Sequence, residues 1–352
     1  MSTSDPRGAV LRSDYGELVR EIRRRGLLHP RPAFYARLGA LALAALAVLV
    51  LVLFLLRDSW WALLLAPVFG VVSAQIAFLS HDAAHRQIVR SRRLTTALCL
   101  TLGNLLNGLS YDGGLPSTTR TMRTPNDLES DPDVAAGVFV FGADQAGERR
   151  GGPAWMTRHQ AALFFPLLTL EGVQPAGRGR ARAAAPPGIA HRSAEGLLLF
   201  VHLVLYLALV VSALTWLQAI VFVVVHQAVL GVYLGCSFAP SHKGMPVPTA
   251  EEAADPLLRQ VICSRNIRGG PFIDLALGGL NLQIEHHLFP PNMPRPPNLR
   301  LARPVVRQHC QERGIAYAET TLLASYRLAL GHLHQVGLAV RGPSAPRKKA
   351  TP

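Results

Sequence analysis

Residues 38–56 read LGALALAALAVLVLVLFLL, an uninterrupted run without a single charged side chain. As an α-helix with a rise of roughly 1.5 Å per residue, this run would be about 28 Å long, close to the thickness of the hydrocarbon core of a bilayer. The sequence therefore predicts a transmembrane helix over residues 38–56.

Three further stretches have the same character. Residues 60–79, 196–217 and 219–239 also contain no Asp, Glu, Lys or Arg. Because the first and second spans are close together in the chain, as are the third and fourth, each pair is predicted to form a tight helical hairpin. The predicted fold is an all-α membrane protein with four transmembrane helices in two hairpins and a helical cap on one side of the membrane.

The segments between and after the spans are polar. They are a basic N-terminal segment (1–37), an insertion between the hairpins (80–195), a C-terminal cap (240–340) and a basic tail that we expect to be disordered (341–352). Nearly all Lys and Arg fall in these segments, and the positive-inside rule then predicts that they face the cytoplasm.

The composition excludes several other classes of protein. Of the 352 residues, 49% are hydrophobic and only 16% are charged, which is too apolar for a soluble or a disordered chain. The formal net charge is +14, but the basic residues are scattered around apolar spans, so nucleic-acid binding is not expected. The four cysteines lie far apart with no CxxC pair, and they indicate neither a zinc site nor a disulfide framework.

Histidines gather beside the ends of the predicted spans. The motif HDAAH places two imidazoles four residues apart on one helical face, and QIEHH places a glutamine and two histidines on another. A single pair of this kind is as often structural as metal-binding, but two clusters on the same side of a membrane favour a metal site. The candidate ligands are His81, His85, His242, Gln283, His286 and His287.

The ligand type does not identify the metal, because imidazole suits iron, zinc and copper alike. HDAAH has Asp82 in its second position and lacks the glutamate that the HExxH motif of a zinc protease requires.

Five motifs carry a resemblance to a known family. HDAAH, GLSYD, NDLESDPDV, FAPSHKGMP and RNIRGGPFIDLALGGLNLQIEHHLFP resemble the integral-membrane fatty acid desaturases, which have three histidine boxes. The resemblance runs from about residue 20 to about residue 331, and a glutamine opening the third box is typical of front-end and linoleoyl-CoA-type desaturases. It implies a di-iron centre at the cytoplasmic mouth of four transmembrane helices, which uses O2 to introduce a double bond into an acyl chain.

The resemblance also assigns roles to individual residues. His81, His85, His286 and His287 match iron-ligand positions, Gln283 matches the variable first position of the third box, and His242 matches a further ligand. Asp82 and Glu285 are predicted to orient neighbouring imidazoles as hydrogen-bond acceptors.

The implied partners follow from this chemistry. They are an acyl-CoA or acyl-lipid substrate within membrane lipid and a separate electron donor, which would be a ferredoxin, cytochrome b5 or flavoprotein. A separate donor is expected because the sequence shows no HPGG signature of cytochrome b5.

The second histidine box of the family, KHNxHHxHPN, is missing. Its four histidine positions are occupied here by Thr118, Thr121, Met122 and Thr124, while the flanking motifs keep their spacing. Codons for such a box, read one base out of frame, spell the observed STTRTMRTP, so we interpret residues 113–125 as a compensated frameshift. A hydroxyl or a thioether is a poor iron ligand, and the chain as written is therefore predicted to be inactive.

Rival functions remain open on the sequence. They are a catalytically inert membrane homologue, a related di-iron hydroxylase, and a transporter that relays protons through His202 and His226 in the third and fourth spans. For these two histidines, a structural role bonded to a neighbouring helix is the simpler interpretation. Likewise, the arginines at positions 295, 300, 303 and 307 are interpreted as a solvated basic face in preference to a phosphate site.

Overall fold

The computed structural model describes residues 6–110, 137–170, 192–289, 293 and 297–340. Within this part of the chain, helices dominate, and the strands form one short parallel pair, β1 (Asn266–Ile267) with β2 (Glu319–Thr320). The predicted all-α architecture is confirmed. The four positions of the missing second box and the tail 341–352 lie outside the described residues.

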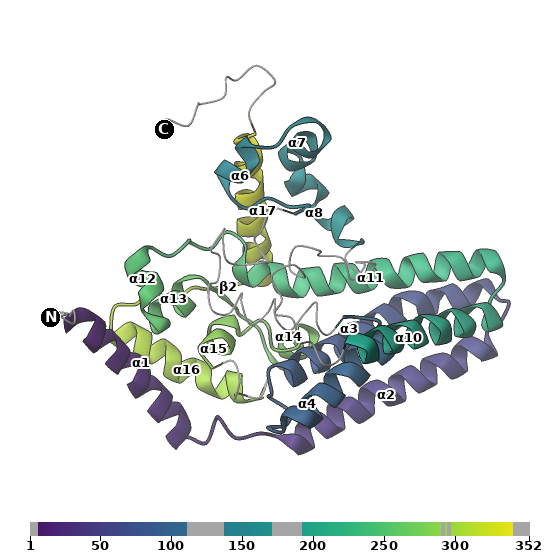
Figure 1. Cartoon of the computed structure of the whole chain (residues 1–352), viewed down its shortest axis with the longest axis horizontal. Helices are drawn as coiled ribbons and strands as arrows, with labels where there is room; N and C mark the ends of the chain where they lie inside the picture. The colour runs from purple at the N-terminus through teal and green to yellow at the C-terminus, as the bar shows by residue number, and fades with distance from the viewer. Residues whose placement is uncertain (1–5, 111–136, 171–191, 290–292, 294–296, 341–352) are drawn as a thin grey trace.

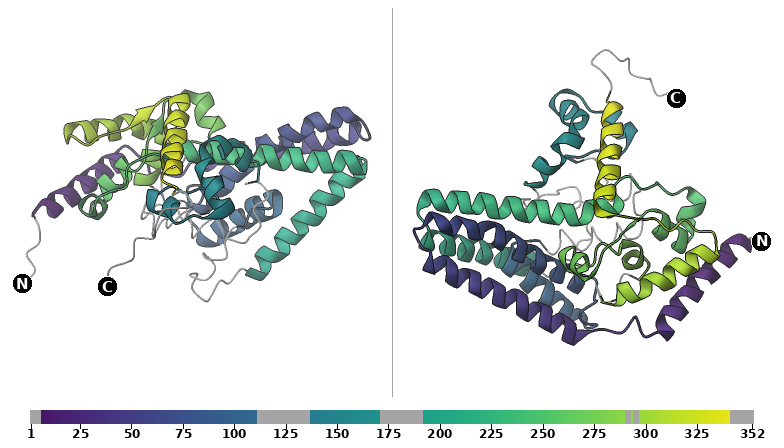
Figure 2. Two further views of the ribbon diagram at one scale, coloured as in Figure 1. Left: turned by 90° about the horizontal axis from the view of Figure 1, so that it is seen from above. Right: turned by 180° about the vertical axis from the view of Figure 1, so that it is seen from behind.

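Four helices are long and apolar enough to cross a membrane, as predicted. They are α2 (Pro32–Leu55), η1 (Trp60–Leu64) continued by α3 (Leu65–Ala84), α10 (Arg192–Ala213) and α11 (Trp216–His242). These helices extend to the right of the cap in Figure 1. Seen from above, α10 and α11 meet at their short turn and diverge from there toward the cap (Figure 2).

The helix ends differ from the predicted spans in a way that matters for the site. Helix α3 continues beyond residue 79 to Ala84, and α11 continues beyond residue 239 to His242. Helix α10 ends at Ala213, earlier than the predicted 217. Candidate ligands are therefore carried on rigid helix ends rather than on loops.

The two hairpins are tied together at the end far from the cap. The backbone N–H of Asp58, which has a left-handed φ of 60°, donates to the carbonyl of Ala213 (3.1 Å). The Gln218 side chain donates to the carbonyl of Asp58 (3.2 Å) and also accepts from the N–H of Thr215. These bonds satisfy backbone groups at helix ends that would otherwise be unpaired.

Helix α3 lies against α11 in the centre of the bundle. A β-carbon on Gly70 would lie 2.8 Å from Val229 Cγ1 and 3.1 Å from the carbonyl oxygen of His226, so the glycine permits this close approach. Many apolar side chains of α2 and α10 are exposed, as a lipid-facing surface requires. Examples are Leu41, Leu51, Leu55, Phe200, Leu205 and Val211.

The cap is built from helices at both ends of the chain. Its members are α1 (Pro6–Arg24), α12 (Ala250–Ala254), α13 (Pro256–Ile262), α14 (Pro271–Ala276), α15 (Gln283–Leu288) and α16 (Pro297–Glu312). Leu18 and Ile22 of α1 are fully buried in one core with residues of α13, α15 and α16. The predicted N-terminal segment 1–37 thus contributes a helix to the cap and the start of α2.

A second group of helices packs beside the end of α11. It comprises α6 (Ala143–Gly147), α7 (Gly151–Arg158), α8 (Gln160–Leu168) and α17 (Leu322–Leu338), with Phe164, Leu168, Ala239 and Leu333 in a shared core. On the other side of the bundle, α4 (Arg92–Cys99) and the π-helix η2 (Leu100–Leu105) pack on α3 and α10.

Candidate metal centre

The first pair of histidines sits at the cap end of α3. His81 lies in the last turn of the helix, and His85 is its C-cap residue, so the spacing of four residues places the two rings 4.5 Å apart between centroids. The chain then reverses direction at Arg86, which has a φ of 55°. The HDAAH motif therefore forms one face at the end of a transmembrane helix.

The third histidine comes from α15, the helix that carries QIEHH. The amide oxygen of Asn266 accepts the backbone N–H of Ile284 (3.0 Å), which fixes the start of this short helix against β1. The His286 ring then lies 5.4 Å from that of His81 and 5.1 Å from that of His85. One ligand nitrogen from each of these three residues lies within 4.8 Å of the other two. We call His81, His85 and His286 the three-histidine cluster.

The imidazoles of His85 and His286 are in the neutral form, which can bind a metal. Burial lowers the pKa of His85 to about 4 and the pKa of His286 well below its usual range, so both imidazoles are neutral at pH 7 and keep a lone pair. In the described part of the chain, the Nε2 atoms of both residues are buried and have no hydrogen-bond partner. Buried polar atoms are normally satisfied, and a metal ion between the three rings would satisfy these two. The donor set thus fits a transition metal that prefers nitrogen ligands.

The other three predicted ligands gather next to this cluster. The rings of His242 and His287 lie 4.7 Å apart, and the amide nitrogen of Gln283 is 2.9 Å from His242 Nε2. Nδ1 of His287 lies 3.1 Å from the amide oxygen of Gln260, which therefore accepts its proton. The rings of His286 and His287 are 6.0 Å apart, so all six predicted residues line one region.

Asp82 and Glu285 differ in what they contact. The Asp82 carboxylate lies 3.6 Å from His81 Nδ1 and accepts a hydrogen bond from the Tyr35 hydroxyl (3.0 Å), which suits the predicted orienting role. The Glu285 carboxylate instead accepts from the Tyr317 hydroxyl and from the Asn266 amide, each at 2.7 Å. Glu285 therefore fastens α15 to the β1–β2 region, and complete burial raises its pKa to about 7.

Two glutamines beside the histidines were not predicted. The amide nitrogen of Gln87 lies 3.4 Å from His286 Nδ1, and Gln260 bonds His287. Both side chains are buried. Gln87 follows His85 by two residues, which is a weak signal, whereas only the fold brings Gln260 of α13 to α15.

Arg265 is a further unpredicted residue near the site. Its guanidinium is buried and donates to the carbonyl oxygens of Pro240 (2.8 Å) and Lys243, and its backbone N–H donates to the carbonyl of Ser241 (3.0 Å). It thereby holds the end of α11 on both sides of His242, where its positive charge also complements the C-terminus of the helix.

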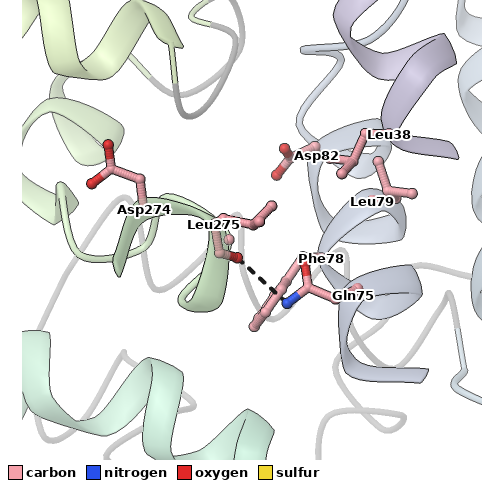
Figure 3. A pocket seen from close by; sticks show the side chains of 8 residues that line it. Leu38, Gln75, Phe78, Leu79, Asp82, Asp274 and Leu275 are labelled. Atoms are coloured by element: carbon pink, nitrogen blue, oxygen red, sulfur yellow. Dashed lines mark hydrogen bonds between the residues drawn. The ribbon is translucent and has the colours of Figure 1, made fainter. Parts of the chain in front are cut away.

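A small pocket lies between α3 and α14, with Asp82 of the HDAAH motif among its lining residues (Figure 3). Leu38, Phe78, Leu79 and Leu275 provide apolar walls, Asp82 and Asp274 add carboxylates, and Gln75 donates to the carbonyl of Leu275 (3.4 Å). No histidine is among its lining residues, so this pocket is separate from the metal ligands.

The histidines inside the membrane are bonded to neighbouring helices. His226 lies between the Ser73 hydroxyl (3.1 Å from Nε2) and the Tyr206 hydroxyl (2.6 Å from Nδ1), and His202 Nδ1 donates to the carbonyl of Leu105 (2.9 Å). These contacts favour the structural interpretation over a proton relay.

The arginines of α16 are also engaged. Arg300 pairs with Asp274 (2.7 Å), and Arg303 and Arg307 pair with Glu319. Arg295 lies outside the described residues. Arg300, Arg303 and Arg307 therefore form ion pairs with carboxylates of the cap.

Comparison with known proteins agrees with the geometry. The profile of the family described as "Fatty acid desaturase" matches residues 58–321, about three quarters of the chain. The chain is 26% identical over 325 residues to the Delta(5) fatty acid desaturase fat-4 of Caenorhabditis elegans, covering 89% of this chain and 71% of the relative. It is 27% identical over 335 residues to Fatty acid desaturase 3 of Bos taurus, covering 90% of this chain and 71% of the relative.

A third relative is longer. The chain is 27% identical over 274 residues to an Acyl-lipid (9-3)-desaturase of Physcomitrium patens, which covers 75% of this chain but only 51% of the relative. The chain thus spans between about half and about seven tenths of the curated relatives it matches.

Proposed function

Because the chain belongs to the fatty acid desaturase family, we propose that its scaffold serves to introduce a double bond into an acyl chain at the metal centre between α3 and α15. The observation that carries the proposal is the three-histidine cluster, which lies at the end of a transmembrane helix and beneath the cap. At that position a lipid-bound chain can approach the metal without leaving the membrane.

The chemistry requires a metal. An unactivated C–H bond has no acidity that a side chain could use, so acid–base residues cannot remove its hydrogen. When bound, iron together with O2 and electrons from a donor supplies the oxidising power. The protein's part is to hold the ion with His81, His85 and His286, while Asp82 sits beside His81 and the buried amide of Gln87 beside His286.

The family implies a second iron, whose ligands here would be His242, His287 and Gln283 together with the second box. The chain supplies threonine and methionine at the four box positions, so several imidazoles are lost. We therefore propose that the chain as written does not desaturate, and that it derives from a di-iron desaturase.

The topology and partners belong to the same proposal. We propose that the metal centre faces the cytoplasm, since the positive-inside rule favours that side for the basic segments. The substrate is then an acyl-CoA or an acyl-lipid reached from the inner leaflet, and a separate reductase or electron-carrier protein delivers the electrons there.

Restoring the second box tests the proposal. The experiment compares the chain as written with a variant that carries Ser117→Lys, Thr118→His, Thr119→Asn, Thr121→His, Met122→His and Thr124→His. Both are expressed in cells that supply a cytochrome b5 or ferredoxin system, and total fatty acids are analysed by gas chromatography and mass spectrometry. We expect a new unsaturated fatty acid only with the restored variant, and its loss when His85→Ala is added.

Other outcomes decide between the rival functions. A hydroxylated fatty acid from the restored variant would make it a hydroxylase. A folded, metal-loaded restored variant with neither product would contradict the desaturase proposal and favour the inert homologue. Sequencing of the gene across codons 113–125 tests the frameshift separately.

A further inference from the structure

We infer that the chain as written holds one first-row transition-metal ion, bound by His81, His85 and His286, and that the adjacent pair His242 and His287 holds none. The inference deepens the proposed function, because it concerns the same metal centre, and it rests on that proposal only for the identity of the site. It differs from the di-iron centre that the family implies, because the three-histidine cluster offers three imidazoles and the adjacent pair offers only two.

The three-histidine cluster is complete in itself. It provides three imidazoles from α3 and α15, one nitrogen from each lying within 4.8 Å of the others, and three protein ligands with an open position suffice for a bound ion. His85 and His286 are 7% and 1% exposed, and in the described part of the chain their Nε2 atoms have no other partner. Leaving two such atoms buried and unbonded is costly, so ion binding here removes an existing penalty.

The adjacent pair is incomplete. It offers two imidazoles, and the amide N–H of Gln283 already donates to Nε2 of His242 (2.9 Å), where it occupies a lone pair that a metal would need. An amide is a much poorer ligand than imidazole for iron or zinc. Two imidazoles and one amide therefore fall short of the usual three strong ligands.

Among the described residues, no third histidine, cysteine or carboxylate joins this pair in a group with ligand spacing, because the three-histidine cluster is the one such group found there. Residues 111–136, which include the altered second box, contain neither histidine nor cysteine, whatever their placement. Among the histidines that the structure describes elsewhere, His202 and His226 are bonded to other groups within the bundle, and His159 and His332 lie against the carbonyls of Trp155 and Phe141.

The three-histidine cluster does not depend on the missing second histidine box. All of its ligands come from boxes one and three, on α3 and α15. Its supporting contacts come from Asp82, Gln87 and Tyr35, none of which belongs to residues 113–125. The alteration of box two thus removes one half of the centre and leaves the other.

The test counts metal ions on the purified full-length chain. The protein is extracted in detergent, stripped with a chelator, reloaded with Zn²⁺ or anaerobically with Fe²⁺, desalted and analysed by mass spectrometry of the elements. We expect about one ion per chain. His85→Ala and His286→Ala should each lower the apparent affinity for the ion by at least about tenfold, whereas His242→Ala should leave it unchanged.

Controls separate loss of the site from loss of the fold. His334→Ala changes an exposed histidine and should retain the ion, and each variant must elute as a single species with unchanged far-ultraviolet dichroism. Cobalt(II) provides a second readout, because its visible absorption should appear with the His242→Ala variant and be absent with His85→Ala.

Three results would overturn the inference: two ions per chain, no ion at all, or equal loss of the ion in His242→Ala and His85→Ala. These results are distinct from failure of the proposed function. If the box-restored variant binds two ions but makes no product, the desaturase proposal fails while the single ion of the chain as written stands.

Discussion

Replacing Gly278 by alanine should loosen the contact between box three and α3. Gly278 and Gly279 form the turn between α14 and α15, with φ values of 57° and 77°. A β-carbon on Gly278 would lie 2.5 Å and 2.6 Å from two ring atoms of Phe78, which is on α3 one turn before Asp82. The variant therefore combines backbone strain with a steric clash.

The two contributions can be estimated separately. A left-handed φ costs an L-residue about 1–2 kcal/mol, and overpacking against a buried ring costs about 1–3 kcal/mol. Gly278→Ala should thus lower the free energy of unfolding by about 2–5 kcal/mol. Because the turn positions α15, it should also weaken ion binding at the three-histidine cluster by about tenfold or more.

Gly314 provides a matched control. It has nearly the same φ, 65°, but a β-carbon there would meet no atom within 4 Å. Gly314→Ala should carry only the backbone cost, so the two variants should differ by about 1–3 kcal/mol. Unfolding by SDS in mixed micelles measures the difference, and metal titration measures the second effect.

A third variant checks the cause. Phe78→Leu added to Gly278→Ala should recover part of the lost stability, because it removes the ring from the path of the new β-carbon. The argument that this turn positions α15 would be refuted by either of two results. One is equal destabilisation by Gly278→Ala and Gly314→Ala, and the other is normal ion affinity in Gly278→Ala.

Three further predictions use the same unfolding assay. His226→Leu removes the bonds to α3 and α10 and should cost about 1–3 kcal/mol, whereas no change would mean that the buried imidazole contributes nothing to helix association. Arg265→Met removes the guanidinium donors to the carbonyls of Pro240, which keeps the Ser325 hydroxyl as a partner, and of Lys243, and it should cost about 1–3 kcal/mol. Arg265→Lys should recover only part of this, because lysine lacks the planar set of donors of the guanidinium. Tyr317→Phe leaves the buried carboxylate of Glu285 with one donor fewer and should cost about 1–3 kcal/mol, while an unchanged midpoint would show that the bond is not needed.

The transmembrane part of the fold could be predicted from the sequence, because uncharged runs of sufficient length have one stable form in lipid. The helix ends could not. The predicted second span ended at residue 79, where Ser80 and His81 interrupt the apolar run, yet α3 continues to Ala84. Backbone hydrogen bonds continue a helix regardless of side-chain polarity when the polar residues face a cap instead of lipid.

In the candidate site, too, contacts set by local spacing could be predicted from the sequence, and contacts between distant segments could not. The pairing of His81 with His85 follows from helical spacing, and the motif QIEHH similarly identified His286. The contact of Gln260 with His287 depends on how α13 packs on α15, and no local pattern encodes it. The contacts of Glu285 could not be predicted for a similar reason, because its partners Tyr317 and Asn266 are adjacent only after the strands pair.

The metal centre joins parts of the chain that are made at different times. Gln87 and His286, in contact across the centre, are 199 residues apart in sequence. At a synthesis rate of about 5–20 residues per second, the histidines of α3 enter the membrane roughly 10–40 s before their partner leaves the ribosome. During this interval they cannot form the cluster, so any ion is acquired only after the last third of the chain has folded. A chain truncated before α15 would keep His81 and His85 but would lack the third ligand of the cluster.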